Sequence, residues 1–341
     1  MADEGAAGGT GAGAARLALP LGLTRLFPWL PEALAPMRVV ALENPFAAAD
    51  AAAGWGRKLS WRWARRLAAL RGLPCWTLED GFFRSVGLGK RGAPAWSIVL
   101  DRTGIYFDGR AASDVEALIA APPDPAMLAR GARLRDLIVR SRLSKYNHVP
   151  DRPLALAAPA GARRIVVLDQ VAGDQSLPGA GADEAAFAAM ARAAAEARGA
   201  GAAVFLKTHP DVEAGLARGM LGAVDLPRVP AGAHPHALLD EVDEVWTASS
   251  QLGFEALIRG RAARCFAAPF YAGWGLTQDS PATPEAAAIL ARRPRRDIAL
   301  DALIDAAVGR YPLYFDVARR RPVDAEEGLE RLAAARDASQ A

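Results

Sequence analysis

The chain has little cysteine and no long hydrophobic run. Its two cysteines, Cys75 and Cys265, lie far apart. They make neither a disulfide framework nor a zinc-ligand cluster, and such usage is typical of a reducing compartment. The most apolar stretch, residues 17–42, is broken by four prolines and by charged residues. A membrane-spanning helix needs roughly 20 mostly apolar residues, so no span is expected.

The chain also lacks a strong excess of one charge. Lysine and arginine number 41 against 38 aspartates and glutamates, which gives a net charge of +3. This is far from the basic stripe of a nucleic-acid-binding protein, so no nucleic acid partner is expected. The mild excess suits anionic ligands or an anionic membrane surface. The hydrophobic fraction of 52% excludes a disordered chain.

Short runs of β-branched or aromatic residues recur, and turn residues and helical stretches follow them. This alternation favours an α/β fold with a parallel, doubly wound sheet. The predicted strands are 37–42, 73–78, 97–100, 104–107, 164–168, 202–207, 244–248 and 262–266, with 97–100 and 104–107 forming a hairpin. The predicted helices are 113–121, 125–142, 183–198, 233–242, 251–259, 300–309 and 324–335.

Two domains are expected from the 341 residues, at roughly 150 residues per domain. Residues 1–16 lack the positive start and apolar run of a signal peptide and predict a flexible tail. Residues 151–163 are rich in Pro, Ala and Gly and predict a linker. The predicted parts are the tail 1–16, an N-terminal Rossmann-like domain 17–150, the linker 151–163, a C-terminal Rossmann-like domain 164–280, and a helical extension 281–341.

A basic cluster lies in the predicted extension, at Arg292, Arg293, Arg295 and Arg296. A solvated connector is the favoured interpretation over an anion site.

Polar residues gather where the predicted strands end. They are Glu79-Asp80, Asp169, Lys207-Thr208-His209 and Ser249-Ser250. Open α/β sheets bind ligands at the carboxyl ends of their strands. Four such ends, from both halves of the chain, predict a cleft between two Rossmann-like domains.

Ser249 and Ser250 directly precede a predicted helix. Serine there either caps the helix or, with the free N–H groups of the first turn, binds a phosphate. Because Lys207 and His209 lie on the neighbouring strand, phosphate binding is at least as favoured as helix capping. His209 is held extended by the proline that follows it and can donate to a phosphate oxygen, although a lone histidine is more often structural.

Two pairs of carboxylates have open roles. Glu79 and Asp80 can supply a general base, a helix cap, or an ion-pair partner for Arg84. Asp169 and Asp174 lie at a strand exit into a glycine-containing loop, where either is a nucleophile or a turn former.

Two further motifs have a structural and a functional interpretation. Tyr271, Gly273 and Trp274 can wall a sugar or stack on a base, although aromatic clusters are usually core packing. His234-Pro-His236 has no carboxylate or cysteine companion and predicts a surface turn rather than a metal site. No metal site is expected.

The chain resembles the retaining β-Kdo transferases of capsular polysaccharide synthesis, which use CMP-Kdo. The matching blocks are 78–89, 97–108, 144–147, 169–176, 207–212, 247–257 and 269–277, all in family order. The resemblance implies a GT-B fold, with two Rossmann-like domains facing a central cleft, and a transfer that needs no metal or cofactor.

The resemblance also implies residue roles. Asp174 matches the nucleophile, and Glu79-Asp80 matches an acid/base motif in which the second residue acts. On the donor side, His209, Ser249 and Ser250 match residues beside the CMP phosphate. Gln251 belongs to the same donor-side set, and Arg84 or Lys207 is expected to orient the Kdo carboxylate.

The expected function is transfer of β-Kdo from CMP-β-Kdo to a glycolipid or saccharide, either lipid-linked or Kdo-terminated, by double displacement. The chain has room for one transferase module. The alternatives are a CMP-sialic acid or other nucleotide-dependent transferase, and a non-catalytic capsule-assembly subunit. Capsule export machinery is the expected protein partner, and the expected location is cytoplasmic or peripheral at the inner face of the cytoplasmic membrane.

Overall fold

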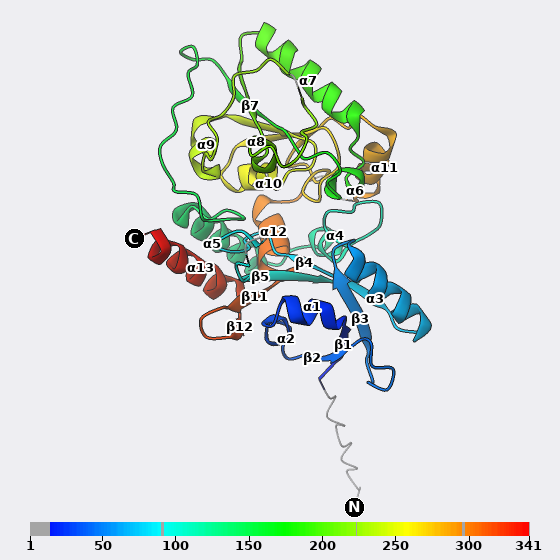
Figure 1. Ribbon diagram of the computed structural model, residues 1–341. Coiled ribbons are helices and arrows are strands. Elements are labelled where there is room, and N and C mark those ends of the chain that lie inside the picture. Colours follow the sequence, from blue (N-terminus) through cyan, green and yellow to red (C-terminus); the bar gives the residue numbers. More distant parts are fainter. Residues whose placement is uncertain (1–13, 90–91, 223, 295–296, 341) are drawn as a thin grey trace, which may run out of the picture. The chain divides into compact units, whose positions relative to one another are not determined.

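A computed structural model describes residues 14–89, 92–222, 224–294 and 297–340 (Figure 1). The chain divides into two compact units, Met1–Cys75 (unit 1) and Trp76–Ala341 (unit 2). No helix among the described residues is both long and apolar enough to cross a membrane.

Unit 1 is built on three parallel strands. β1 (Arg16–Leu19) pairs with β2 (Arg38–Ala41) on one side and with β3 (Ala51–Trp55) on the other. Helices α1 (Leu21–Leu26), α2 (Leu30–Ala33) and α3 (Leu59–Leu70) complete the unit, and α3 packs against β3. The tail prediction ran to residue 16, but Arg16 already opens β1, and residues 1–13 lie outside the described part.

Small residues explain the close packing of α3 on β3. A Cβ atom on Gly54 would lie 2.3 Å from the Cα of Trp61, so only glycine fits there. Ala52, Ala64 and Ala68 are buried in the same cluster. Sequence reasoning missed both β3 and α3, because the alanine-rich β3 lacks the β-branched residues that mark a strand.

Unit 2 contains a five-stranded parallel sheet of order β10-β9-β8-β6-β7. Its strands are β6 (Arg164–Leu168), β7 (Ala203–Lys207), β8 (Glu244–Thr247), β9 (Ala262–Cys265) and β10 (Gln278–Asp279). The connecting helices are α6 (Ser176–Gly179), α7 (Glu184–Gly199), α8 (Pro210–Glu213), α9 (Pro235–Glu241), α10 (Gln251–Ile258) and α11 (Pro284–Arg292). The predicted alternation of strands and helices in this segment is confirmed.

Unit 2 also contains an antiparallel ladder, in which β4 (Cys75–Asp80) pairs with β5 (Ser97–Asp101), β5 with β11 (Pro312–Asp316), and β11 with β12 (Arg321–Val323). Its helical segments are α4 (Asp114–Ala120), α5 (Pro125–Ser141), α12 (Leu300–Ile304), the π-helical η2 (Asp305–Arg310) and α13 (Ala325–Gln340). The α/β class is confirmed, and the predicted parallel sheet is the five-stranded one, whereas this second ladder is antiparallel. Residues 281–341 are not purely helical, because they supply β11 and β12.

The hairpin of 97–100 with 104–107 is also wrong. The carboxylate of Asp101 accepts the N–H groups of Thr103 and Gly104 at 2.9 and 2.6 Å, which turns the chain immediately after β5. The two neighbours of β5 are instead β4 and β11.

The predicted surface turn at His234 and His236 is wrong. The two residues are only 2% and 1% exposed, and they form the buried start of α9. His234 caps the helix by accepting the N–H of His236, and Nε2 of His236 donates to the Leu143 carbonyl at 2.5 Å. Burial lowers the pKa of His236 to about 4, so its ring is neutral at pH 7.

The solvated-connector interpretation fails for Arg293, which is 3% exposed. Its guanidinium donates to Glu116 at 3.0 Å and to the carbonyls of Pro269 and Ala272. It therefore ties the end of α11 to α4 and to the segment after β9. Arg295 and Arg296 of the same cluster lie outside the described residues.

Candidate functional site

The carboxyl ends of three neighbouring strands meet at one edge of the parallel sheet. β6 lies between β7 and β8, with Leu168 opposite Lys207 and Val167 opposite Trp246. Since parallel strands end at the same edge, the residues that follow them come together there. The structure thus gathers three of the four polar strand ends that the sequence singled out: Asp169, Lys207 to His209, and Ser249-Ser250.

Ser249 joins two of these loops. The Gln170 amide donates to the Ser249 hydroxyl at 3.0 Å and accepts the Ser249 N–H at 2.9 Å. The same hydroxyl donates to the Ser176 hydroxyl at 3.3 Å. Ser250 instead caps α10, since its hydroxyl accepts the Leu252 N–H at 3.3 Å. The two serines therefore divide the roles: Ser250 takes the capping position, and Ser249 faces the loop that carries Asp174.

The rival carboxylates Asp169 and Asp174 have different surroundings. Asp169 is buried, and its Oδ1 accepts three backbone N–H groups, from Gln170, Met220 and Leu221, each at 2.9 Å. Asp174 is exposed, and its Oδ1 accepts, within the described residues, only the N–H of Ser176, at 2.8 Å. Asp169 thus has a structural role, because it binds the backbone near residue 220, whereas the Asp174 carboxylate lies at the surface.

We expect Asp169→Ala to destabilise the fold more than Asp174→Ala. Loss of Asp169 removes the carboxylate that accepts the buried Gln170 and Leu221 N–H groups and one of the two acceptors of the Met220 N–H, which should lower the free energy of unfolding by about 3 kcal/mol or more. Loss of the exposed Asp174 should cost about 1 kcal/mol. Urea denaturation of both variants measures the difference; equal losses would contradict the structural role of Asp169.

His209 and Lys207 follow β7. Nδ1 of His209 accepts the Asp211 N–H at 3.1 Å, so the neutral ring carries its proton on Nε2, which can donate to a ligand. Burial lowers the pKa of Lys207, although the nearby Glu213 carboxylate opposes this shift. A histidine donor and a partly desolvated ammonium suit the binding of a phosphate or carboxylate.

Asp80 ends β4 and pairs with Arg84, whose Nε lies 2.7 Å from Asp80 Oδ1. Arg84 is 2% exposed and also donates to the Ser85 hydroxyl and the Ala93 carbonyl. A Cβ atom on Gly89 would lie 2.5 Å from this guanidinium, so the loop encloses it closely. The ion pair with Arg84, one of the open roles of Asp80, is observed, and Arg84 is placed to hold Asp80 rather than to reach a substrate carboxylate.

Two charged residues near this strand end were missed by sequence reasoning. Lys145 lies among Tyr106, Tyr146, Asp80 and Glu79; burial lowers the pKa of its ammonium, but these acidic groups hold it above its ordinary value. Glu255 on α10 is 4% exposed, and burial raises its pKa to about 7 against the opposing effects of Ser144, Lys145 and Gln251. Only the block Ser144-Lys-Tyr-Asn147 hinted at Lys145, without a role for it.

The raised pKa of Glu255 predicts a pH-dependent stability. The folded state holds a proton on Glu255 up to about pH 7, whereas the unfolded chain releases it near pH 4.5. Stability is therefore lost as pH rises from about 4.5 to 7. Glu255→Gln cannot lose this proton. Its free energy of unfolding, relative to that of the wild-type chain, should therefore rise by up to about 3 kcal/mol between pH 5 and pH 8. Urea denaturation at both pH values checks this, with the exposed Glu196→Gln as control. The same change of stability with pH in Glu255→Gln, Glu196→Gln and the wild-type chain would contradict it.

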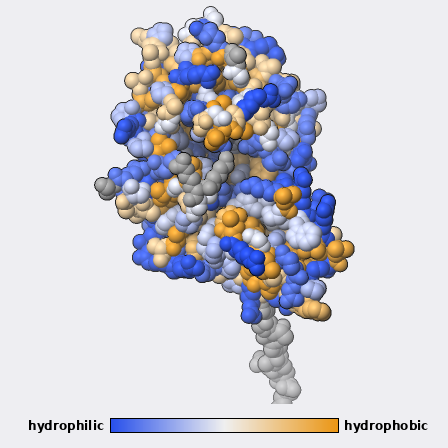
Figure 2. All heavy atoms as spheres, in the orientation of Figure 1, coloured by the Kyte–Doolittle hydropathy of each residue, from blue (hydrophilic) through white to orange (hydrophobic). Residues whose placement is uncertain are grey.

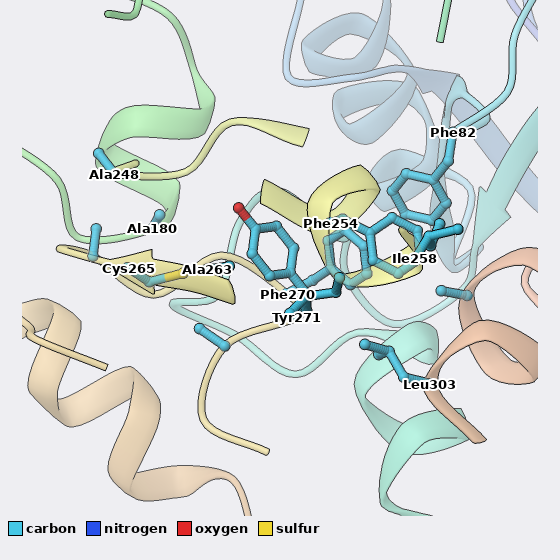
Figure 3. Close-up of a cluster of buried hydrophobic side chains, with 14 of the residues drawn as sticks. Phe82, Ala180, Ala248, Phe254, Ile258, Ala263, Cys265, Phe270, Tyr271 and Leu303 are labelled. Atoms are coloured by element: carbon cyan, nitrogen blue, oxygen red, sulfur yellow. The ribbon is translucent and has the colours of Figure 1, made fainter. Parts of the chain in front are cut away.

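Gln251 connects the phosphate-side helix to the acidic strand end. Its Nε2 donates to the Phe82 carbonyl at 2.6 Å and to Glu255 Oε1 at 3.1 Å. The Phe82 ring stacks on Phe270 at 4.6 Å between centroids and meets Phe254 edge-on at 5.7 Å (Figure 3). The segment after Asp80 is thus anchored to α10, within unit 2.

Tyr271, Gly273 and Trp274, considered as a sugar or base wall, lie in the protein core. The Tyr271 and Trp274 side chains are both fully buried. Tyr271 donates to the Ser250 carbonyl at 2.6 Å, and Trp274 donates to the Phe270 carbonyl at 2.8 Å. Gly273 has φ +82° and donates its N–H to Asp279 at 2.9 Å. The packing interpretation holds for both rings, and Tyr271 supports the turn that presents Ser249 and Ser250.

Among the described residues, no three histidine, cysteine, aspartate or glutamate side chains converge as a metal site would require.

The family profile described as "Capsule polysaccharide biosynthesis protein" matches residues 50–314, which include every site residue named above. The chain belongs to this capsule polysaccharide biosynthesis family. A solved structure, "Thermosulfurimonas dismutans KpsC, beta Kdo 2,4 transferase", superimposes with a TM-score of 0.83 at 34% identity, over 94% of this chain and 98% of that one. A second, "beta Kdo 2,7 transferase" of the same organism's KpsC, has a TM-score of 0.67 at 24% identity and shows the shared fold.

Two curated proteins are also similar to this chain in sequence. "Capsule polysaccharide modification protein LipA" of Neisseria meningitidis serogroup A is 38% identical over 79% of this chain and 39% of its own length. "Lipopolysaccharide-processing protein LpsZ" of Rhizobium meliloti is 37% identical over 74% of this chain and 57% of its own. The chain therefore spans about two-fifths to three-fifths of the length of these relatives.

Proposed function

We propose that the chain is a retaining glycosyltransferase of GT-B type that moves β-Kdo from CMP-β-Kdo to a glycolipid or saccharide acceptor. One observation carries the proposal. In unit 2, Gln251 ties the Asp80 strand end to the helix preceded by Ser249, and Ser249 contacts the loop of Asp174. The similarity to a KpsC domain whose name is "beta Kdo 2,4 transferase" supports the choice of sugar.

The first step is a displacement on the donor. The Asp174 carboxylate attacks the anomeric carbon, and the bond from that carbon to the CMP phosphate oxygen breaks. His209 Nε2–H, the Ser249 hydroxyl and Lys207 stabilise the charge that develops on the departing phosphate. Asp174 is suited to this step because it is exposed and, as far as the chain is described, has a single N–H partner.

The second step returns the sugar to an acceptor. The acceptor hydroxyl attacks the anomeric carbon of the Kdo–Asp174 ester, and its proton passes to the Asp80 carboxylate. The bond between that carbon and the Asp174 oxygen breaks, which restores the Asp174 carboxylate. Arg84 fixes the rotamer of Asp80. The nearby Lys145 ammonium offsets the negative charge of Asp80 and Glu79. Two inversions give net retention, as in retaining glycosidases.

The test is turnover by the purified chain. CMP-Kdo generated in situ is offered with Kdo-terminated and lipid-linked acceptors, and the product is analysed by mass spectrometry and by NMR of the anomeric configuration. One added β-Kdo is expected. No product with any acceptor, with CMP-Kdo left intact, would instead indicate a non-catalytic capsule-assembly subunit, and transfer from CMP-sialic acid alone would overturn the donor assignment.

We also expect transfer to need no metal ion, since the charge on the leaving phosphate is balanced by His209, Lys207 and the serines in the proposed step. Activity measured after dialysis against EDTA should equal that of the untreated chain. A loss that Mg²⁺ or Mn²⁺ restores would contradict this expectation.

A further inference from the structure

The positive charge of the chain is concentrated in unit 1. Residues 14–75 contain nine arginines and lysines but only three aspartates and glutamates, although the whole chain has a net charge of +3. Residues 51–78 contain no acidic residue and six basic ones: Arg57, Lys58, Arg62, Arg65, Arg66 and Arg71. This segment includes α3, which is thus attractive to an anionic partner.

Helix α3 exposes large apolar side chains on the side away from β3. Ala64 and Ala68 are at most 1% exposed, whereas Leu59, Trp63 and Leu70 are 81%, 48% and 83% exposed. At about 100° per residue, these three lie within about 40° of one another around the helix axis, on the side away from the two alanines. We name Leu59, Trp63 and Leu70 the α3 stripe.

Arginines accompany the α3 stripe along the helix. Arg62 and Arg66 are exposed, and Arg66 falls next to the stripe on the helical wheel. In the described part of the chain, neither guanidinium has a hydrogen-bond or ion-pair partner. Figure 2 shows hydrophobic and strongly hydrophilic side chains side by side on the surface over α3.

We propose that the exposed side of α3 docks on an anionic lipid bilayer. Such a helix lies in the interface, with its leucines and tryptophan at the boundary of headgroups and acyl chains and its arginines on lipid phosphates. The single-signed charge fits an anionic surface, and the apolar row, which a purely electrostatic partner would not require, fits the acyl boundary. The surface shares no residue with the candidate site, so its test does not depend on the proposed transfer.

The test uses the full chain in co-sedimentation with phosphatidylcholine vesicles, with and without phosphatidylglycerol. Binding should require the anionic lipid and weaken with added salt. Replacing two arginines, in Arg62→Ala with Arg66→Ala, should weaken binding about 25-fold, at about fivefold per charge. Leu59→Ser with Leu70→Ser should weaken it at least about tenfold.

The matched controls lie in unit 2. Leu216→Ser removes a leucine that is 79% exposed, and Arg192→Ala removes an exposed arginine; both should bind vesicles like the wild-type chain. All the substituted side chains are exposed, so circular dichroism and melting should not change. Equal binding to both vesicle types, or unchanged binding by the α3 variants, would overturn the proposal. No binding to either type would also overturn it, and would point to an acidic protein as the partner of α3.

Discussion

Asp174→Ala should abolish transfer and leave CMP binding nearly intact. Asp174 is the proposed nucleophile, and removing one member of a catalytic unit lowers kcat by about 10⁴-fold or more. The carboxylate is exposed and accepts one N–H group, so its loss should barely disturb the neighbouring phosphate residues. Transfer assays and CMP titration by calorimetry measure the two effects.

A structural control separates chemistry from folding in this experiment. Asp174→Asn keeps an oxygen that can accept the Ser176 N–H but lacks the negative charge needed for attack. If Asp174 only forms the turn, Asn should restore activity to near the wild-type level. If Asp174 is the nucleophile, Asn should be as inactive as Ala, and recovery of activity in Asp174→Asn would refute the assignment.

The second large effect is expected at the phosphate. His209→Ala should slow transfer about a hundredfold or more, the usual scale for removing one donor to a developing negative charge. Ser249→Ala should have a smaller effect, because the N–H groups at the start of α10 remain. Steady-state kinetics with CMP-Kdo compare the two.

Because His209 also caps α8, its replacement should cost about 1 kcal/mol of stability, which urea denaturation reports separately. His209→Gln keeps an N–H donor near the position of Nε2 and should recover part of the lost rate. Near-normal turnover of His209→Ala would remove the phosphate assignment.

The parallel sheet and its strand ends were predictable from the sequence. Residues 165–168 of β6 are all β-branched or large apolar and all buried, as expected for a strand covered on both faces. Because parallel strands end at the same edge of a sheet, the residues after β6, β7 and β8 lie at one edge. Asp169, His209 and Ser249 are found there.

Other features depend on distant pairing and were not predictable from local patterns. β11 returns from residue 312 to pair with β5, and no local signal marks such a partner. The burial of Glu255 and Lys145 depends on the docking of α10 beside the Asp80 strand end, so neither residue stood out in the sequence. For Tyr271 and Trp274 the sequence left a ligand wall open beside core packing, because aromatic content alone does not distinguish the two.

Intact-protein mass spectrometry of Asp80→Ala mixed with CMP-Kdo tests the double displacement most directly. The variant lacks the base for the second step, so the first step should leave one Kdo residue esterified to the chain with release of CMP. Peptide mapping should place the adduct on Asp174, and the double variant Asp80→Ala, Asp174→Ala should show none. An adduct on Asp169, or one that survives in the double variant, would contradict the account.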